Sequence, residues 1–203
     1  MSLRSALLVL LRIAPMSGYE LQKHFSHSVG YVWHAPDSQI YPELRKMAEE
    51  GLVEPEEQTR GSVATRRVYH VTDSGEETFD DWMRTPLKYQ RTRDAAHLKA
   101  AYLESVDHET RVAFLDDHIA HWTSELKCWE DEIAKIDALT TPMLNRRLEV
   151  TEEEDREMTI AFKRFAYEGL ADRAKTEIAW ARKGLELVNR FAPETTAEEL
   201  AGE

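Results

Sequence analysis

The apolar positions at the start of the chain recur every three to four residues, which is the spacing of a helix with one buried face. This pattern predicts a first helix over about residues 2–13, which Pro15 ends. Ser17 and Glu20 then have the spacing of a capping box, so a second helix is predicted over about residues 18–28. The chain is therefore expected to begin with two short amphipathic helices.

A third helix is predicted from about Ser38, with Gly51 as the residue that ends it. Its apolar residues share one face: Ile40, Leu44, Met47 and Ala48. The opposite face carries Ser38, Tyr41, Pro42, Arg45, Lys46 and Glu49. Pro42 lies near the start of this helix, where it removes a backbone donor and biases the preceding residue away from helical angles. An otherwise regular helix thus starts with an irregular turn, which needs an explanation.

The periodicity then changes from helical to extended. Residues 52–58 and 64–72 predict two short strands that a polar turn joins into a β-hairpin with a basic return strand. A fourth helix is predicted over about residues 72–83, capped by Thr72 or Asp73. Its apolar residues are Phe79, Trp82 and Met83.

Three helices followed by a β-hairpin form a winged helix, in which the third helix enters the major groove of DNA and the hairpin lies along the backbone. The irregular start of the third helix is then explained, because that turn faces DNA. Pro42 supplies apolar bulk for a thymine methyl group, while Gln39 and Tyr41 offer hydrogen bonds to bases or phosphates. The predicted DNA contacts are Ser17, Tyr19, Ser38, Gln39, Tyr41, Pro42, Arg45, Lys46, Arg60, Arg66 and Arg67.

The segments "SGYEL", "SQIYPELRKMAEEGLV" and "RRVYHVTDSGEETFDDWM" resemble the PadR family of bacterial transcriptional regulators over about residues 3–83. The C-terminal half, through "LKAAYL" and "EIAWARKGLELV", resembles the helical domain of the larger members, of the virulence-activator type. The resemblance implies a dimeric DNA-binding regulator, often a repressor that a small, frequently aromatic, molecule releases. One departure lies in the wing, where "GSVATRR" lacks the proline that the family often has, so the wing-tip geometry stays open.

A polar linker is predicted over residues 85–96, followed by a helix over about residues 95–105. A long helix over about 107–138 and a last helix over about 151–191 follow, with a loop containing Pro142 between them. The first long helix has a heptad seam of Val112, Leu115, Ile119, Trp122, Leu126, Trp129, Ile133 and Ile136. The last helix repeats this spacing at Tyr167, Ala171, Ala174, Ile178, Ala181, Leu185 and Val188.

Two antiparallel helices with such seams are expected to dimerise, which suits an operator with two-fold symmetry. The residues predicted at the dimer contact are Leu115, Ile119, Trp122, Leu126, Trp129, Ile178 and Leu185. The alternative is that the seams satisfy each other within a monomer that packs on the winged helix.

Charge is distributed unevenly along the 203 residues, whose formal net charge is −12. Residues 1–92 contain 11 Lys and Arg and 13 Asp and Glu, so the N-terminal part is nearly neutral while the rest is acidic. No apolar run reaches 18 residues, so no membrane span is predicted. A single cysteine, Cys128, excludes an internal disulfide and fits a cytoplasmic protein.

Candidate chemistry outside the winged helix is sparse. His118 and His121 near Asp117 and Glu125 are a conceivable metal site, but histidines exposed on an acidic helix are commoner, so no metal and no cofactor are predicted. Cys128 is expected to be inert. The core is the expected place for Trp33, Trp122 and Trp129, with a pocket for a planar ligand as the alternative.

The sequence thus predicts a mainly α protein. Residues 1–84 are expected to form a winged-helix DNA-binding domain, 85–96 a linker, and 97–203 a helical dimerisation and effector domain. The predicted function is sequence-specific binding of double-stranded DNA, by a homodimeric repressor that a small aromatic effector releases. The alternatives are a winged helix used for protein contacts, or an activator without a ligand. A metal-dependent hydrolase is disfavoured, because the sequence has no nucleophile–base motif or glycine-rich phosphate loop.

Overall fold

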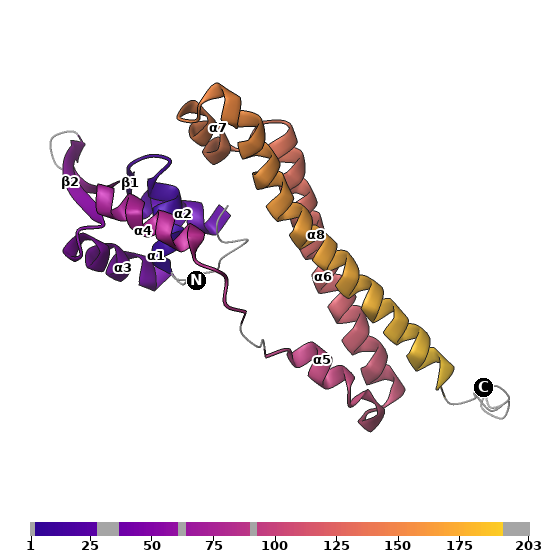
Figure 1. The fold of residues 1–203 in the computed structure, drawn as a ribbon. Coiled ribbons are helices and arrows are strands. Elements are labelled where there is room, and N and C mark those ends of the chain that lie inside the picture. The colour runs from indigo at the N-terminus through magenta and orange to yellow at the C-terminus, as the bar shows by residue number, and fades with distance from the viewer. Residues whose placement is uncertain (1–2, 28–36, 61–63, 90–92, 193–203) are drawn as a thin grey trace, which may run out of the picture. The chain divides into compact units, whose positions relative to one another are not determined.

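The computed structural model describes residues 3–27, 37–60, 64–89 and 93–192 (Figure 1). The chain divides into two compact units, residues 1–89 with 146–151 and residues 90–145 with 152–203. Trp33 and the tip of the predicted hairpin lie outside the described residues.

The first unit has the element order of a winged helix. Its elements are α1 (Leu3–Leu11), β1 (Met16–Ser17), α2 (Gly18–His27), α3 (Asp37–Glu49), β2 (Val53–Arg60), β3 (Ala64–Val71) and α4 (Asp73–Arg84). All four predicted helices and both predicted strands are therefore confirmed, with ends that differ by a few residues. The two-residue strand β1 was not predicted.

The sheet is antiparallel with the strand order β1-β3-β2. In the hairpin, Val53 pairs with Val71, while Glu54 pairs with His70 and Glu57 with Arg67, so two acids of β2 oppose basic residues of β3. β1 adds to the free edge of β3, where Met16 pairs with Tyr69. The start of α2 is thereby fixed to the wing.

Buried apolar side chains from all three N-terminal helices meet the sheet in one core. They are Leu7, Leu8, Leu10, Met16, Leu21, Phe25, Ile40, Leu44, Met47, Val53, Val68 and Tyr69. The alternation predicted for Tyr69 and Val71 is only partly kept, since Val68 is also buried and Val71 is half-buried. Met83 is exposed, so it adds nothing to the apolar face predicted for α4.

The motif Tyr69-x-x-Thr72-x-x-Gly75 joins the wing to α4. The Thr72 hydroxyl accepts a hydrogen bond from the amide of Gly75 at 3.2 Å and donates one to the carbonyl of Gly51 at 2.7 Å. Gly75 is buried so closely against the chain that a Cβ there would lie 2.2 Å from the carbonyl oxygen of Leu52. The motif is thus a structural junction, and Thr72 rather than Asp73 caps the helix.

The second unit is helical. It contains α5 (Ala95–Ala100), the 3₁₀ helix η2 (Leu103–Ser105), α6 (His108–Asp137) and α8 (Glu153–Arg190), while α7 (Pro142–Glu149) spans the division between the units. α6 and α8 are long and pack side by side (Figure 1). Asp107 caps α6, since its carboxylate accepts from the amide of Thr110 at 2.7 Å.

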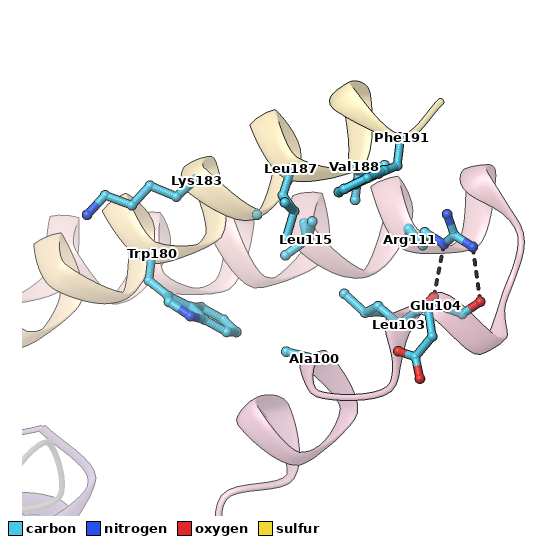
Figure 2. Close-up of a pocket in the computed structure, with 11 residues that line it drawn as sticks. Ala100, Leu103, Glu104, Arg111, Leu115, Trp180, Lys183, Leu187, Val188 and Phe191 are labelled. Atoms are coloured by element: carbon cyan, nitrogen blue, oxygen red, sulfur yellow. Dashed lines mark hydrogen bonds between the residues drawn. The ribbon is translucent and has the colours of Figure 1, made fainter. Parts of the chain in front are cut away.

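Two predictions for this half were wrong. The helix expected over 95–105 stops at Ala100 and resumes as η2, and the Leu103 carbonyl accepts hydrogen bonds from Nε of Arg111 at 2.9 Å (Figure 2) and from the Val106 amide at 3.3 Å. The loop expected around Pro142 is helix α7, which begins at that proline. The first position of a helix tolerates proline, since its amide would have no helical partner there.

Candidate nucleic-acid interface

The exposed face of α3 is the centre of the candidate interface. Ile40, Leu44 and Met47 are completely buried on one side of this helix. The exposed residues on the other side are Ser38, Gln39, Tyr41, Pro42, Arg45 and Lys46. The two faces predicted from the sequence are therefore confirmed, and six of the predicted contact residues share one surface.

Pro42 lies inside α3 rather than before it. A proline has no amide hydrogen, so the carbonyl of Ser38 four residues earlier loses its helical donor. Ser38 is exposed, so water or a bound molecule can satisfy that carbonyl at little cost. The helix thus tolerates the irregularity on the side that faces solvent.

Tyr41 reaches from α3 to the first turn of α2. A Cβ on Gly18 would lie 2.5 Å from Cε1 of Tyr41, so the glycine makes room for the ring. Gly18 is buried, while Tyr41 stays about half exposed. The two helices therefore position this ring together, with part of it directed outward.

The charges around α3 leave Arg45 exposed. Arg4 of α1 binds two acids, Glu43 within α3 and Glu50 just after it. Its Nε lies 3.0 Å from Glu43 and its Nη2 lies 3.1 Å from Glu50. Lys46 lies 4.0 Å from the same Glu50 carboxylate. Among the described residues no carboxylate pairs with Arg45, so this side chain can reach a phosphate or base.

The second helix contributes differently from the prediction. Ser17 is buried, and its hydroxyl both donates to Glu20 at 2.8 Å and accepts from the Glu20 amide at 3.3 Å. The predicted capping box is thus confirmed, but Ser17 has no exposed group for DNA. Tyr19 is 69% exposed, and Lys23 lies one turn further along and is exposed as well. Lys23 was missed, although its spacing from Tyr19 on the polar face was visible in the sequence.

The wing carries cations that are already paired. Arg66 donates to Glu20 at 3.3 Å and to Gln58 at 3.2 Å, while Arg67 lies 3.5 Å from Glu57. The opposing strand is acidic, so the wing is closer to neutral than its return strand suggests. The side chain of Arg60 lies outside the described residues.

Glu20 links the capping box to the wing. Burial raises its pKa, but the hydrogen bonds from Ser17 and the charge of Arg66 outweigh burial and leave the pKa below its ordinary value. The carboxylate is therefore ionised at neutral pH and competes with DNA phosphates for Arg66.

The residues predicted at the dimer contact lie on the paired helices of the second unit. Leu115, Trp129 and Ile178 are buried between α6 and α8 of a single chain. The other four, Ile119, Trp122, Leu126 and Leu185, are half-buried. The two helices therefore pack their seams together within one chain and bury them in part, and the dimer contact predicted at these residues stays a prediction.

The remaining candidate groups of this unit are held in local contacts. His118 lies 3.3 Å from Glu177, with its ring near Trp122 and Trp180. Cys128 is a half-buried free thiol. No cluster of three potential metal ligands occurs among the residues that the structure describes, and no described helix is long and apolar enough to cross a membrane.

Comparisons with known proteins agree with this geometry. Residues 7–81, which span α1 to α4, match the model of the transcriptional regulator PadR-like family. The chain is 29% identical over 143 residues to the negative transcriptional regulator PadR of Bacillus subtilis, covering 70% of this chain and 78% of that protein.

Solved structures are similar along nearly the whole chain. The structure of Bacillus subtilis PadR in complex with operator DNA has a TM-score of 0.73 and 26% identity, and covers 92% of this chain and 98% of that one. The structure of the same protein in complex with p-coumaric acid has a TM-score of 0.69 and 26% identity, and covers 92% and 95%.

Proposed function

Since residues 7–81 of this chain are a PadR-like transcriptional-regulator domain, we propose that it is a homodimeric repressor that binds operator DNA and that a small molecule releases. The relative of known structure binds operator DNA in one crystal and p-coumaric acid in another. The proposal gives the chain no catalytic role and places its action in the cytoplasm, where bacterial DNA lies.

The observation that carries the proposal is the exposed polar face of α3. That face presents Tyr41 and Arg45, which no carboxylate of the described residues pairs with, on a helix whose other side is buried in the core. Arg45 extends from a helix whose position the core fixes, so its guanidinium can bind a guanine in a bidentate manner or bind a phosphate. We assign sequence recognition to Gln39, Tyr41 and Arg45, and backbone contact to Lys46 and Ser38.

Tyr19 and Lys23 extend this surface along α2. Both are exposed on one face of a helix whose first turn adjoins Tyr41. We assign them phosphate contacts on one flank of the recognition helix. Ser17 is left out of the contact set, because its hydroxyl is satisfied inside the capping box.

The wing is assigned a phosphate contact that requires an exchange of partners. The side chains of Arg66 and Arg67 are more than two-fifths exposed in their ion pairs, and such pairs are weak in water. A duplex that approaches the wing can therefore replace Glu20 and Glu57 as their partners. Arg60 keeps its predicted role as a wing-tip contact.

The homodimer contact is proposed on α8. Met158, Phe162 and Phe165 recur at four and three residues and form an apolar stripe, the α8 stripe. Phe162 and Phe165 are 66% and 68% exposed, which is costly for large aromatic side chains in water. A second copy of the chain covers them and brings two winged helices to one operator.

A protection assay on the DNA upstream of the protein's own gene tests the proposal. We expect a protected site with two-fold symmetry, and loss of that protection in Arg45→Ala with unchanged thermal unfolding. Lys88→Ala is the matched control, since Lys88 is an exposed cation of the same unit outside α3 and the wing. Equal protection by wild type and Arg45→Ala would exclude α3 from the groove.

A further inference from the structure

A network of hydrogen bonds runs along one face of the wing and ends at α2. Gln58 lies directly opposite Arg66 in the hairpin, and Glu56 lies opposite Val68. Opposed residues of an antiparallel pair project to the same side, and every second residue along a strand returns to that side. The polar side chains that share this face are Glu56, Gln58, Arg66 and His70.

Gln58 joins two groups of opposite charge. Its Nε2 donates to Oε2 of Glu56 at 3.0 Å, and its Oε1 accepts from Nη2 of Arg66 at 3.2 Å. An ionised carboxylate can only accept hydrogen bonds, and a guanidinium can only donate them. The two neighbours therefore fix which end of the amide faces which, because a reversed amide would set oxygen against oxygen and N–H against N–H.

Glu56 is itself held in place. Nε2 of His70 lies 3.0 Å from the same carboxylate oxygen that accepts from Gln58. The hydrogen bonds from Gln58 and His70 lower the pKa of Glu56 below its ordinary value. The carboxylate is therefore ionised at neutral pH and accepts from the amide, so both strands of the wing together determine how Gln58 is oriented.

The guanidinium of Arg66 is held at both of its terminal nitrogens. Nη1 donates to Glu20 of α2 at 3.3 Å, and Nη2 donates to Gln58. A guanidinium has five N–H donors, so these two contacts leave others for a phosphate. Arg67, on the opposite face of the wing, lies 3.5 Å from the carboxylate of Glu57. Of these partners Gln58 alone is uncharged, so it can position a cation without cancelling its charge.

We propose that Gln58 is a positioning residue for the contact between Arg66 and a DNA phosphate, and that Glu56 orients Gln58 for this role. The inference rests on the DNA binding proposed above. When a phosphate replaces Glu20 at Nη1, Gln58 still accepts from Nη2, so the guanidinium keeps its place during the exchange. A side chain that is already fixed loses less conformational freedom when it binds, and the neutral amide does not repel the duplex.

Relaxation of ¹⁵N at Nε of Arg66, measured on the full chain without DNA, tests the positioning directly. Gln58→Met keeps the length of the side chain and removes both of its hydrogen bonds. We expect the order parameter of Arg66 to fall in this variant, whereas that of Arg67 should stay at its wild-type value, because Arg67 lies on the other face. An Arg66 side chain that is equally ordered in wild type and Gln58→Met overturns the proposal.

Titrations with the operator and with an unrelated duplex test the role in binding. Gln58→Met should weaken both by about threefold to tenfold, because a phosphate contact carries no sequence information and an unfixed side chain must be ordered on binding. In an Arg66→Gln background the same change should have no further effect, whereas in an Arg67→Gln background it should keep its full effect. A loss that persists in Arg66→Gln overturns the proposal, since Gln58 would then act on the hairpin and not through Arg66.

A matched pair of variants tests the part of Glu56. Glu56→Met and Glu54→Met remove the same charge from exposed positions on the same face of β2. Glu56→Met also frees the amide of Gln58, so it should bind duplex DNA less tightly than Glu54→Met, and equal affinities overturn the orienting role. A protein that binds no duplex refutes the proposed function and with it the DNA role of Gln58, whereas the relaxation of Arg66 still decides whether Gln58 fixes that side chain.

Discussion

The ring of Tyr41 covers Gly18 so closely that a Cβ at position 18 would lie 2.5 Å from its Cε1. This contact links the first residue of α2 to the exposed face of α3 that we assign to DNA recognition. The ring lies where a side chain at position 18 would begin, so any residue larger than glycine there moves it.

Gly18→Ala should therefore weaken operator binding without unfolding the domain. Tyr41→Ala should cost about 1–3 kcal/mol of binding, which is the range for one base or phosphate contact. Because both changes act on the same ring, adding Gly18→Ala to Tyr41→Ala should cost nothing further. Operator titrations of the two single variants and the double variant measure this coupling, and additive losses would contradict it.

The ion pairs of the wing predict opposite effects for its two strands. Replacing Arg66 and Arg67 by Gln should weaken binding to any duplex and flatten the salt dependence by roughly one unit per lost contact. Glu57→Gln should strengthen binding, because Arg67 loses its competing partner. Glu77→Gln, a change of the same charge at an exposed site on α4, is the control. If Glu57→Gln and Glu77→Gln strengthen DNA binding equally, the gain comes from the change in net charge and not from the release of Arg67.

Gly75 should be intolerant of a methyl group. Gly75→Ala forces a Cβ to within 2.2 Å of the Leu52 carbonyl, and overpacking of this kind costs about 1–3 kcal/mol. Gly169→Ala is the matched control, since nothing lies within 4 Å of its Cβ position and alanine stabilises a helix interior by roughly 0.5–1 kcal/mol. Denaturant unfolding compares them, and a Gly75→Ala variant as stable as wild type would show that the junction can shift.

The dimer contact can be separated from the core of the helix pair. Phe162→Glu or Phe165→Glu should give a monomer with the helical content of wild type, because both residues are exposed in the single chain. Leu115→Ala should instead destabilise the helix pair by about 2–5 kcal/mol, as a truncation in a packed core. Light scattering and circular dichroism on the same samples distinguish the two effects. A Phe162→Glu variant that stays dimeric would exclude the α8 stripe.

The lowered pKa of Glu20 sets the sign of a pH dependence. The folded chain binds fewer protons at this carboxylate than the unfolded chain, so its contribution is present above the ordinary pKa of 4.5 and is lost as pH falls through the lower folded value. Glu20→Gln should therefore be less stable than wild type at pH 7, and the difference should shrink toward pH 3. Hydrogen exchange of the α2 amides follows this unit alone, and a gap that is constant with pH would refute the linkage.

Local patterns predicted most of the winged helix. The capping box of Ser17 and Glu20, the C-terminal Gly51 and the cap Thr72 act over three or four residues, so their sequence spacing is almost their geometry. The same holds for the buried face of α3, because a helix places residues 40, 44 and 47 on one side whatever lies around it.

Contacts between distant segments were not predictable in the same way. The ring of Tyr41 on Gly18, the pairing of Arg66 with Glu20 and the capture of Glu43 by Arg4 depend on how elements meet, which no local spacing encodes. They decide which predicted cations are available, because Arg66 is paired with Glu20 and Glu43 is taken up by Arg4.

The long helices show the same division. The sequence by itself determined that residues around 107–138 and 151–191 form helices with apolar seams, because the heptad period is a property of each helix alone. Only the tertiary structure decided that the two seams cover each other within one chain, since each could bury its apolar area equally well against a second copy. Hydrophobic burial is not directional, so a seam specifies that a partner exists but not which one.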